Sequence, residues 1–387
     1  ALVFSALFYF ACSILNAGIN DTYSDGIWIL RDALYTSESI DSALTFAANS
    51  GFDHVFIQIR SRGDALYKSD HVKMNEKVPA GFDPLEYAVG LGHELNLKVH
   101  AWFNTYLVWS SRIQPVYKEH IYFTQHEWTE ANHYGKLDWR IDLDQPPSPD
   151  WEGIYLSPNH PSVNPYLTKL IREIINRYAV DGIHLDYVRF QDDFYGYNPE
   201  GCKLFESRYG IDPIDITRGI ISKRFGWSSA EVDSITKMWT DFKKNNITEL
   251  LRMVRKELDT IDPETKLSAA VKPNIDQADK RWSQDWMIWL ADGLLDFAVP
   301  MNYYKDINNF KNDLDLMTSQ SPIIDKNNVM MGVATYNQEA KDTAAKIKLA
   351  RELGGYSICV FSYNNHKHDL DWFYPIIQSL SVTGSTK

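Results

Sequence analysis

The chain has 387 residues, of which 44% are hydrophobic and 23% are charged, and its formal net charge is −12. This composition is typical of a globular protein with a large core and not of a disordered chain. The acidic balance argues against nucleic acid or an anionic membrane as a partner, because both require a basic surface.

Residues 1–17 are predicted to form a secretory signal segment. They are apolar, too short to span a membrane, and end at Ala17 in a small-residue cleavage site. The missing initial Met and basic start indicate that the sequence is truncated there, and cleavage before Cys12, as in a lipoprotein, is the alternative. We therefore expect a secreted or periplasmic protein with one domain over residues 18–387 and no membrane span. Its oligomeric state stays open.

From residue 26 onward, short apolar segments alternate with amphipathic ones. Strands are predicted over residues 26–31, 54–60, 98–104, 181–190, 266–274, 296–304, 329–337 and 355–363. Helices are predicted over residues 37–51, 83–96, 162–179, 199–209, 229–259, 282–293, 308–320, 341–354 and 369–381. Such alternation implies a parallel sheet, and eight units imply an α/β fold of the (β/α)8 TIM-barrel type. An open doubly wound sheet is the alternative, but no glycine fingerprint follows the first strand.

Long connections follow the third and fourth predicted strands. Residues 105–162 are rich in Trp, Tyr, His and Pro, and the connection after Phe190 carries helical patches of its own. Connections of this length are usually functional. We therefore expect the loop over residues 105–162 to build part of a binding groove.

The fourth predicted strand contains a carboxylate where an apolar residue would be expected. In DGIHLDYVRF, residues 181–190, the side chains of His184, Asp186 and Val188 share one face. Burying an ionised Asp is costly unless a partner neutralises it, and Arg189 is close in sequence. Asp186 is therefore either a loop anchor paired with Arg189 or a functional carboxylate.

Active sites of such barrels lie at the carboxyl ends of the strands. Polar and aromatic side chains gather at the predicted ends, where they suit the hydroxyls and ring faces of an oligosaccharide or polysaccharide. Individually, each is also explained by the hydrogen-bonding needs of a loop. The predicted substrate-binding residues are Arg60, Tyr67, His100, Trp102, Asn104, His184, Arg189, Lys272, Asn274, Asn302, Tyr303, Tyr304, Tyr336, Asn337 and Tyr363.

Glycoside hydrolysis usually needs two carboxyl groups. Asp186 is the first candidate for a catalytic residue, and Asp64 and Asp306 are candidates for the second. Asp64 is preferred because Arg60 and Arg62 lie in the same loop, and a neighbouring Arg lowers an Asp pKa, as a nucleophile or base requires. No Glu stands at a predicted strand end, which is unusual for a glycosidase barrel.

Other chemistries lack their motifs. The sequence has no HExxH pair, no complete EF-hand loop and no G-x-S-x-G turn, so we expect neither a metal ion nor another cofactor. Cys202 and Cys359 are predicted to be free, buried thiols.

Four segments together resemble the glycosyl hydrolase-like family 10. They are QIRSRGDALYKSD at 58–70, VHAWFNTY at 99–106, YLSPNHPSVNPYL at 155–167 and RYAVDGIHLDYVRF at 177–190. The resemblance implies a glycosidase barrel that hydrolyses O-glycosidic bonds, and some family members act on the glycan strands of peptidoglycan.

Carried over residue by residue, this resemblance points to Asp186 and to the loop with Arg60 and Asp64. The chain departs from the family at Asn164, where members often have Arg, and in having DYVRF where some members have paired Asp residues. The expected function is an exported glycoside hydrolase acting on a polysaccharide or a cell-wall glycan. The alternative is a catalytically inactive carbohydrate-binding barrel.

Family 18 chitinases offer a second comparison, because their fourth strand reads D-G-x-D-x-D-x-E. Asp181 and Asp186 match this pattern, but His184 and Val188 replace its second Asp and its catalytic Glu. Without that Glu, the chitinase mechanism has no proton donor, and chitinase activity is rejected.

Overall fold

The computed structural model describes residues 23–148, 151–320 and 322–381. The predicted signal segment and Cys12 lie outside these residues. Within them, no helix is both long enough and apolar enough to cross a membrane.

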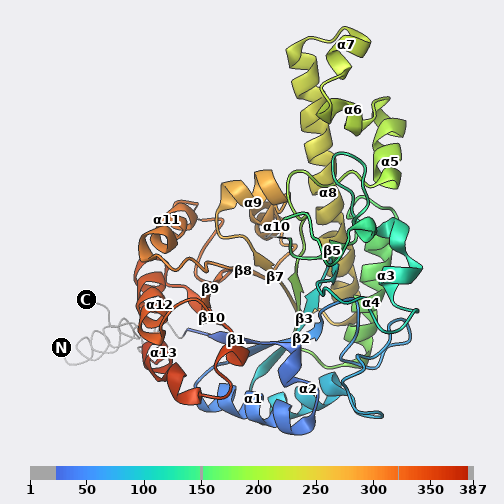
Figure 1. The fold of residues 1–387 in the computed structure, drawn as a ribbon. Helices are drawn as coiled ribbons and strands as arrows, with labels where there is room; N and C mark the ends of the chain where they lie inside the picture. Colours follow the sequence, from blue (N-terminus) through green and yellow to red (C-terminus); the bar gives the residue numbers. More distant parts are fainter. Residues whose placement is uncertain (1–22, 149–150, 321, 382–387) are drawn as a thin grey trace, which may run out of the picture.

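The centre of the molecule is a parallel barrel of eight strands, as predicted (Figure 1). The strands run in the spatial order β8-β7-β6-β3-β2-β1-β10-β9, and single bridges from Ala298 to Val329 and from Met301 to Gly332 join the two ends. The strands are β1 (Gly26–Ile29), β2 (His54–Arg60), β3 (Lys98–Asn104), β6 (Gly182–Asp186), β7 (Lys266–Val271), β8 (Phe297–Pro300), β9 (Met330–Ala334) and β10 (Ser357–Phe361).

Helices surround the barrel and cover the outward faces of its strands (Figure 1). Apolar side chains from strands and helices form the main core between them, whereas Trp28, Phe56, Trp102, Met330 and Cys359 help to fill the barrel interior. The surrounding helices are α1 (Ser37–Asn49), α2 (Pro84–Glu94), α4 (Val163–Arg177), α8 (Ser229–Ile261), α9 (Ile275–Trp282), α10 (Trp286–Ala291), α11 (Ile307–Thr318), α12 (Ala340–Gly354) and α13 (Tyr374–Leu380).

Local sequence explains several element boundaries. Asp83 caps α2 by accepting from the Glu86 N–H at 3.2 Å, and Pro84 stands in the first turn, as predicted. The predicted strand over 181–190 ends early, at Asp186, because Tyr187 adopts a positive φ of 53° that turns the chain out of the sheet. The helix predicted over 282–293 is shorter, and α9 precedes it.

Both long connections were expected, and each has its own structure. After β3, the short strands β4 (Leu107–Trp109) and β5 (Ile154–Tyr155) pair antiparallel, and α3 (Ile121–Thr124) lies between them in sequence. After β6, the chain forms α5 (Pro199–Tyr209), α6 (Pro213–Thr217) and α7 (Ile221–Phe225) before α8 leads back to the barrel.

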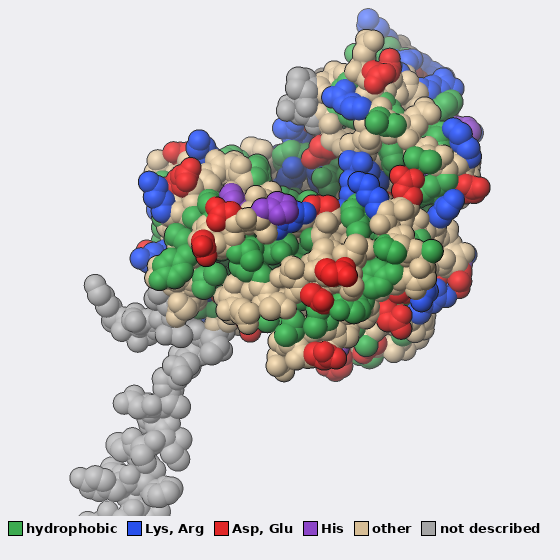
Figure 2. All heavy atoms as spheres, turned by 60° about the horizontal axis from the view of Figure 1, so that its bottom comes forward, with side chains coloured by type: hydrophobic (Ala, Val, Ile, Leu, Met, Phe, Trp, Pro, Cys, Tyr) green, Lys and Arg blue, Asp and Glu red, His purple; other side chains and the backbone are tan. Residues whose placement is uncertain are grey.

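These helices and the first turns of α8 form a lobe that projects from the barrel (Figures 1 and 2). A separate hydrophobic cluster, which includes Cys202, Phe205, Trp239 and Phe242, holds the lobe together. Cys202 in this cluster and Cys359 in the barrel interior are free and buried, as predicted.

Candidate active site

Asp186 is the last residue of β6 and therefore lies at the carboxyl end of the barrel. Its side chain is fixed by two donors: the Trp102 indole N–H donates to Oδ2 at 3.1 Å and the Tyr187 backbone N–H donates to Oδ1 at 2.7 Å. Only 8% of the residue is exposed. The fold thus holds this carboxyl group in one position beneath the mouth of the barrel.

The environment of Asp186 favours its protonated form. Burial raises the pKa of Asp186 to about 6, although the Tyr187 N–H, the charge of Arg189 and the Trp102 N–H each act to lower it. The negative charge of Glu152 adds to the upward shift. A carboxyl group with this pKa can hold and deliver a proton in mildly acidic solution.

Glu152 is the second carboxyl group at this site, and it is not among the residues predicted from the sequence. It stands just before β5, in the long connection after β3, and accepts two hydrogen bonds from Arg189 at 2.8 and 2.9 Å. The Tyr155 hydroxyl donates to Glu152 Oε2 at 2.7 Å. Its side chain is 36% exposed, so solvent and ligand can reach it.

The partners of Glu152 keep it ionised. Partial burial acts to raise its pKa, but the charges of Arg189 and Lys272 and the hydrogen bonds from Tyr155 and Arg189 outweigh burial, so the pKa lies below its ordinary value. The site therefore contains two interacting carboxyl groups whose surroundings push their pKa values apart. Such a pair is how one site provides both a proton donor and an ionised carboxylate.

Two pockets that share Lys272 and Trp282 lie at this end of the barrel, and we call them together the central groove. The larger has a volume of about 530 Å³ and is lined by Glu152 and Trp151 among others. The smaller has a volume of about 280 Å³ and reaches Tyr303 and Tyr304. The groove thus combines aromatic walls with the exposed carboxylate.

Several predicted binding residues do lie at the groove or next to it. Tyr303 stacks on Phe361 with ring centres 5.3 Å apart, and its buried hydroxyl makes no hydrogen bond to any residue that the structure describes. Tyr304 and Tyr336 are 41% and 55% exposed. Asn337 donates to the Tyr303 carbonyl at 2.8 Å and so supports this aromatic wall.

Asn274 also lines the groove, but its polar atoms are largely occupied. Its Oδ1 caps α9 by accepting from the Gln277 N–H at 3.1 Å, and its Nδ2 donates to Asp313 at 3.1 Å.

Arg60 and Tyr67 do not lie at the mouth, which corrects their expected position. The register between β2 and β3 shifts between Gln58 and Arg60, so Arg60 pairs with Phe103 and turns outward into the layer between strands and helices. It is fully buried, with its guanidinium 4.8 Å from the centre of the Phe103 ring. Tyr67 is equally buried against Tyr178.

The structure also places His100 and His184 away from the mouth of the barrel, although both were predicted to bind substrate. His100 lies near the amino end of β3, opposite the mouth, and its Nε2 is 2.8 Å from Nδ1 of His54, the first residue of β2. His184 lies inside the barrel, where the Trp28 indole N–H donates to it at 3.2 Å and Ser268 Oγ is 2.9 Å from its Nδ1. Burial lowers the pKa of His184 to about 3, so it stays neutral.

Three further predicted residues have structural contacts in place of a groove position. Asn302 is buried and donates to the Phe310 carbonyl at 3.0 Å. Asn104 donates to the Ser61 carbonyl at 2.9 Å. Tyr363 packs against Phe46 in the outer core, with ring centres 5.5 Å apart.

Asp64 has a different set of neighbours from Asp186. The Arg62 backbone N–H donates to it at 3.0 Å, the Asn75 side chain donates to its other oxygen, and these bonds outweigh burial and lower its pKa. It therefore anchors its own loop, and a catalytic role for Asp64 stays a prediction. Asp306, the other alternative, caps α11.

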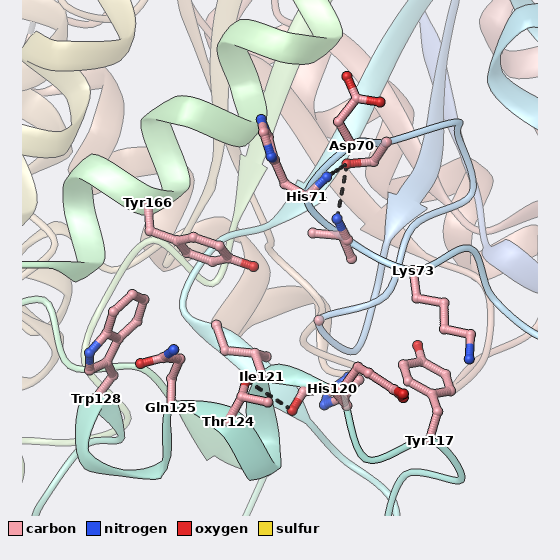
Figure 3. A pocket seen from close by; sticks show the side chains of 14 residues that line it. Asp70, His71, Lys73, Tyr117, His120, Ile121, Thr124, Gln125, Trp128 and Tyr166 are labelled. Carbon is pink, nitrogen blue, oxygen red and sulfur yellow. Dashed lines mark hydrogen bonds between the residues drawn. The ribbon is translucent and has the colours of Figure 1, made fainter.

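The loop of Asp64 borders a larger pocket of about 590 Å³ on the side of β2 and β3 (Figure 3). The Tyr166 hydroxyl points into this pocket, and Tyr117, Lys73 and Trp128 lie around its edge (Figure 3). Neither Asp186 nor Glu152 lines it. Asp186 also lines neither pocket of the central groove, but Glu152 lines the groove and its charge acts on Asp186. The central groove is therefore the candidate active site despite its smaller pockets.

The described residues contain no group of three or more His, Cys, Asp or Glu side chains arranged to hold a metal ion.

Comparison with known proteins identifies the family to which the chain is similar. A model of the family described as Glycosyl hydrolase-like 10 matches residues 25–347. Glycosyl hydrolase DigH of Escherichia coli strain K12 is 26% identical over 275 residues, which cover 66% of this chain and 55% of that protein. Glycosyl hydrolase YngK of Bacillus subtilis strain 168 is 21% identical over 282 residues, which cover 66% of this chain and 46% of that protein. The chain spans about half the length of the curated relatives it matches.

Solved structures share the fold. The glycoside hydrolase domain of PgaB (BpsB) from Bordetella bronchiseptica aligns with a TM-score of 0.66 at 11% identity, over 94% of this chain and 100% of that one. Alpha-L-fucosidase isoenzyme 2 from Paenibacillus thiaminolyticus aligns with a TM-score of 0.61 at 13% identity, over 93% of this chain and 49% of that one. At these identities, the likeness establishes the barrel alone.

Proposed function

The chain belongs to the glycosyl hydrolase-like 10 family, and from this premise we propose that it hydrolyses O-glycosidic bonds in the central groove. One observation carries the proposal: Asp186 and Glu152 interact, and the pKa of the first is raised to about 6 while that of the second is lowered. Glycoside hydrolysis needs this combination of a protonated and an ionised carboxyl group.

In the proposed reaction, protonated Asp186 gives its proton to the glycosidic oxygen as the bond to the anomeric carbon breaks. Ionised Glu152 either removes a proton from the attacking water or attacks the anomeric carbon itself. In the second case, a water molecule deprotonated by Asp186 then releases the sugar from Glu152. Arg189 and Tyr155 keep Glu152 ionised and oriented through their hydrogen bonds. Trp102 holds the Asp186 carboxyl group in position.

The proposed substrate is a polysaccharide or a cell-wall glycan of the peptidoglycan type. The two pockets of the groove lie side by side and share Lys272 and Trp282, and an extended chain of sugar units suits such an arrangement. Tyr303 and Tyr304 offer aromatic surface of the kind that packs against sugar rings. Export of the protein, which the apolar residues 1–17 support, would place it where such glycans occur.

The test is release of reducing ends from a panel of cell-wall and plant glycans. Asp186→Asn and Glu152→Gln should each lower the rate by about 10²- to 10⁴-fold, the range for removal of a general acid or base. Asp64→Asn is the matched control and should retain activity, because Asp64 has other partners.

The opposite result, with Asp64→Asn inactive and Glu152→Gln active, would assign the second carboxyl role to Asp64. A protein that binds these glycans without releasing reducing ends would instead be the non-catalytic carbohydrate-binding barrel. Binding by Asp186→Asn, measured by calorimetry, separates loss of catalysis from loss of folding.

A further inference from the structure

Two cationic side chains, Arg281 and Lys272, line the central groove, and a third, Arg189, is buried behind Glu152. Two of the three form ion pairs. Arg189 pairs with Glu152 at 2.8 Å, and Arg281 pairs with Asp192 at 2.6 Å. In both cases a carboxylate of the protein itself neutralises the cation. The remaining cation, Lys272, follows β7 and lines both pockets of the groove.

Lys272 has no such partner in the part of the chain that the structure describes. Its ammonium makes neither an ion pair nor a hydrogen bond there. It makes a cation–π contact with the Trp282 ring, with 4.6 Å from Nζ to the ring centre. A ring face attracts a cation but accepts none of its N–H groups in strong hydrogen bonds. Trp282 therefore holds the ammonium in place while leaving its donors available.

Leaving this charge unpaired has a cost that a ligand could remove. Burial, followed by the nearby charge of Arg189, lowers the pKa of Lys272 to about 8, and the group is still mostly protonated at pH 7. The charges of Glu152 and Asp186 oppose this shift, but neither carboxylate is close enough to form an ion pair. An anionic group bound in the groove would supply the missing partner.

We propose that Lys272 is the receptor for a carboxylate on the substrate, so that the central groove takes an acidic glycan. This inference rests on the proposed function and narrows its substrate class. The position is suited to it, because Lys272 is shared by the two pockets and lies near both reacting carboxyl groups. A sugar held by its carboxylate here would keep a neighbouring glycosidic bond close to Glu152.

The experiment uses one glycan in two charge states. Glycan strands freed of peptides, which carry lactyl carboxylates, are compared with the same strands after conversion of those carboxylates to methylamides. Binding to the Asp186→Asn protein is measured by calorimetry at pH 7 and at low and high salt. The protein should bind the carboxylate form at least 10-fold more tightly, with a preference that weakens in high salt.

Variants at position 272 test whether Lys272 causes the preference for the carboxylate form. Lys272→Met should remove the preference by weakening binding of the carboxylate form while leaving binding of the methylamide form unchanged. Lys272→Arg should retain most of it, because the charge remains. Lys280→Met is the matched control, since Lys280 is exposed on α9 outside the groove and its loss should change neither affinity.

Several outcomes would overturn the inference. Two of them are equal affinity for the two glycan forms and no binding of either form. The third is an equal loss of affinity for both forms in Lys272→Met, which would mean that Lys272 has a purely structural role. The comparison of the two forms on protein with Lys272 intact keeps the test decisive even if Lys272→Met fails to fold. Charge-dependent binding without any hydrolysis would refute the proposed function alone, and hydrolysis of both forms with equal KM would refute the inference alone.

Discussion

Replacing Trp102 with Phe tests how the pKa of Asp186 is set. The indole N–H donates to Asp186 Oδ2 at 3.1 Å and stabilises the ionised carboxylate. A hydrogen bond to a charged group contributes about 1.5–3 kcal/mol, and one pKa unit corresponds to about 1.4 kcal/mol. Because Phe cannot donate, the variant should raise the pKa of Asp186 from its present value of about 6 by about one to two units.

The assay is the pH dependence of kcat/KM on a soluble glycan. Asp186 acts in its protonated form, so kcat/KM should fall as the pH rises through its pKa, near pH 6 in the unmodified protein. In Trp102→Phe, the same fall should occur about one to two units higher. Trp289→Phe is the matched control, because its indole donates to Thr248 away from the groove, at 3.0 Å. A fall that stays near pH 6, or moves to lower pH, would refute the reasoning.

Three further predictions concern stability. Arg189→Gln should lower the free energy of unfolding by about 3 kcal/mol. This is the lower end of the range for buried ion pairs, and it applies because the partner carboxylate of Glu152 is 36% exposed. An unchanged free energy of unfolding in urea denaturation would contradict this. Gly182→Ala should cost about 1–3 kcal/mol by overpacking, because the added Cβ would lie 2.2 Å from the His100 ring. Gly90→Ala, with open space around it in the middle of α2, should instead stabilise by about 0.5–1 kcal/mol, and thermal unfolding of both variants checks the contrast in sign. Phe205→Ala should destabilise the lobe by about 3–5 kcal/mol, because Phe205 is buried in the hydrophobic cluster of the lobe. Amide hydrogen exchange should become faster in the lobe and stay slow in the barrel strands. Faster exchange in both would mean that the lobe and the barrel unfold together.

Sequence patterns predicted the barrel well because its strands are short runs whose apolar side chains are buried on both faces. The bounds of β2 and β3 match the predicted segments 54–60 and 98–104, and α5 matches 199–209. These elements depend on local composition and on capping or turn residues next to them, such as Asp83 before α2. The same pattern placed Asp186 on the fourth barrel strand, although the strand ends at Asp186 and not at the predicted residue 190.

The amino-acid sequence by itself determined the order of strands and helices, the barrel they imply and the carboxyl group of Asp186 at its mouth. Only the tertiary structure decided which groups meet there. Glu152 reaches Arg189 from 37 positions earlier in the chain, and Arg60 leaves the mouth because a register shift against β3 turns it outward. Both outcomes depend on the pairing of segments distant in sequence, whereas hydrophobic periodicity reports only which side of its own segment a residue occupies.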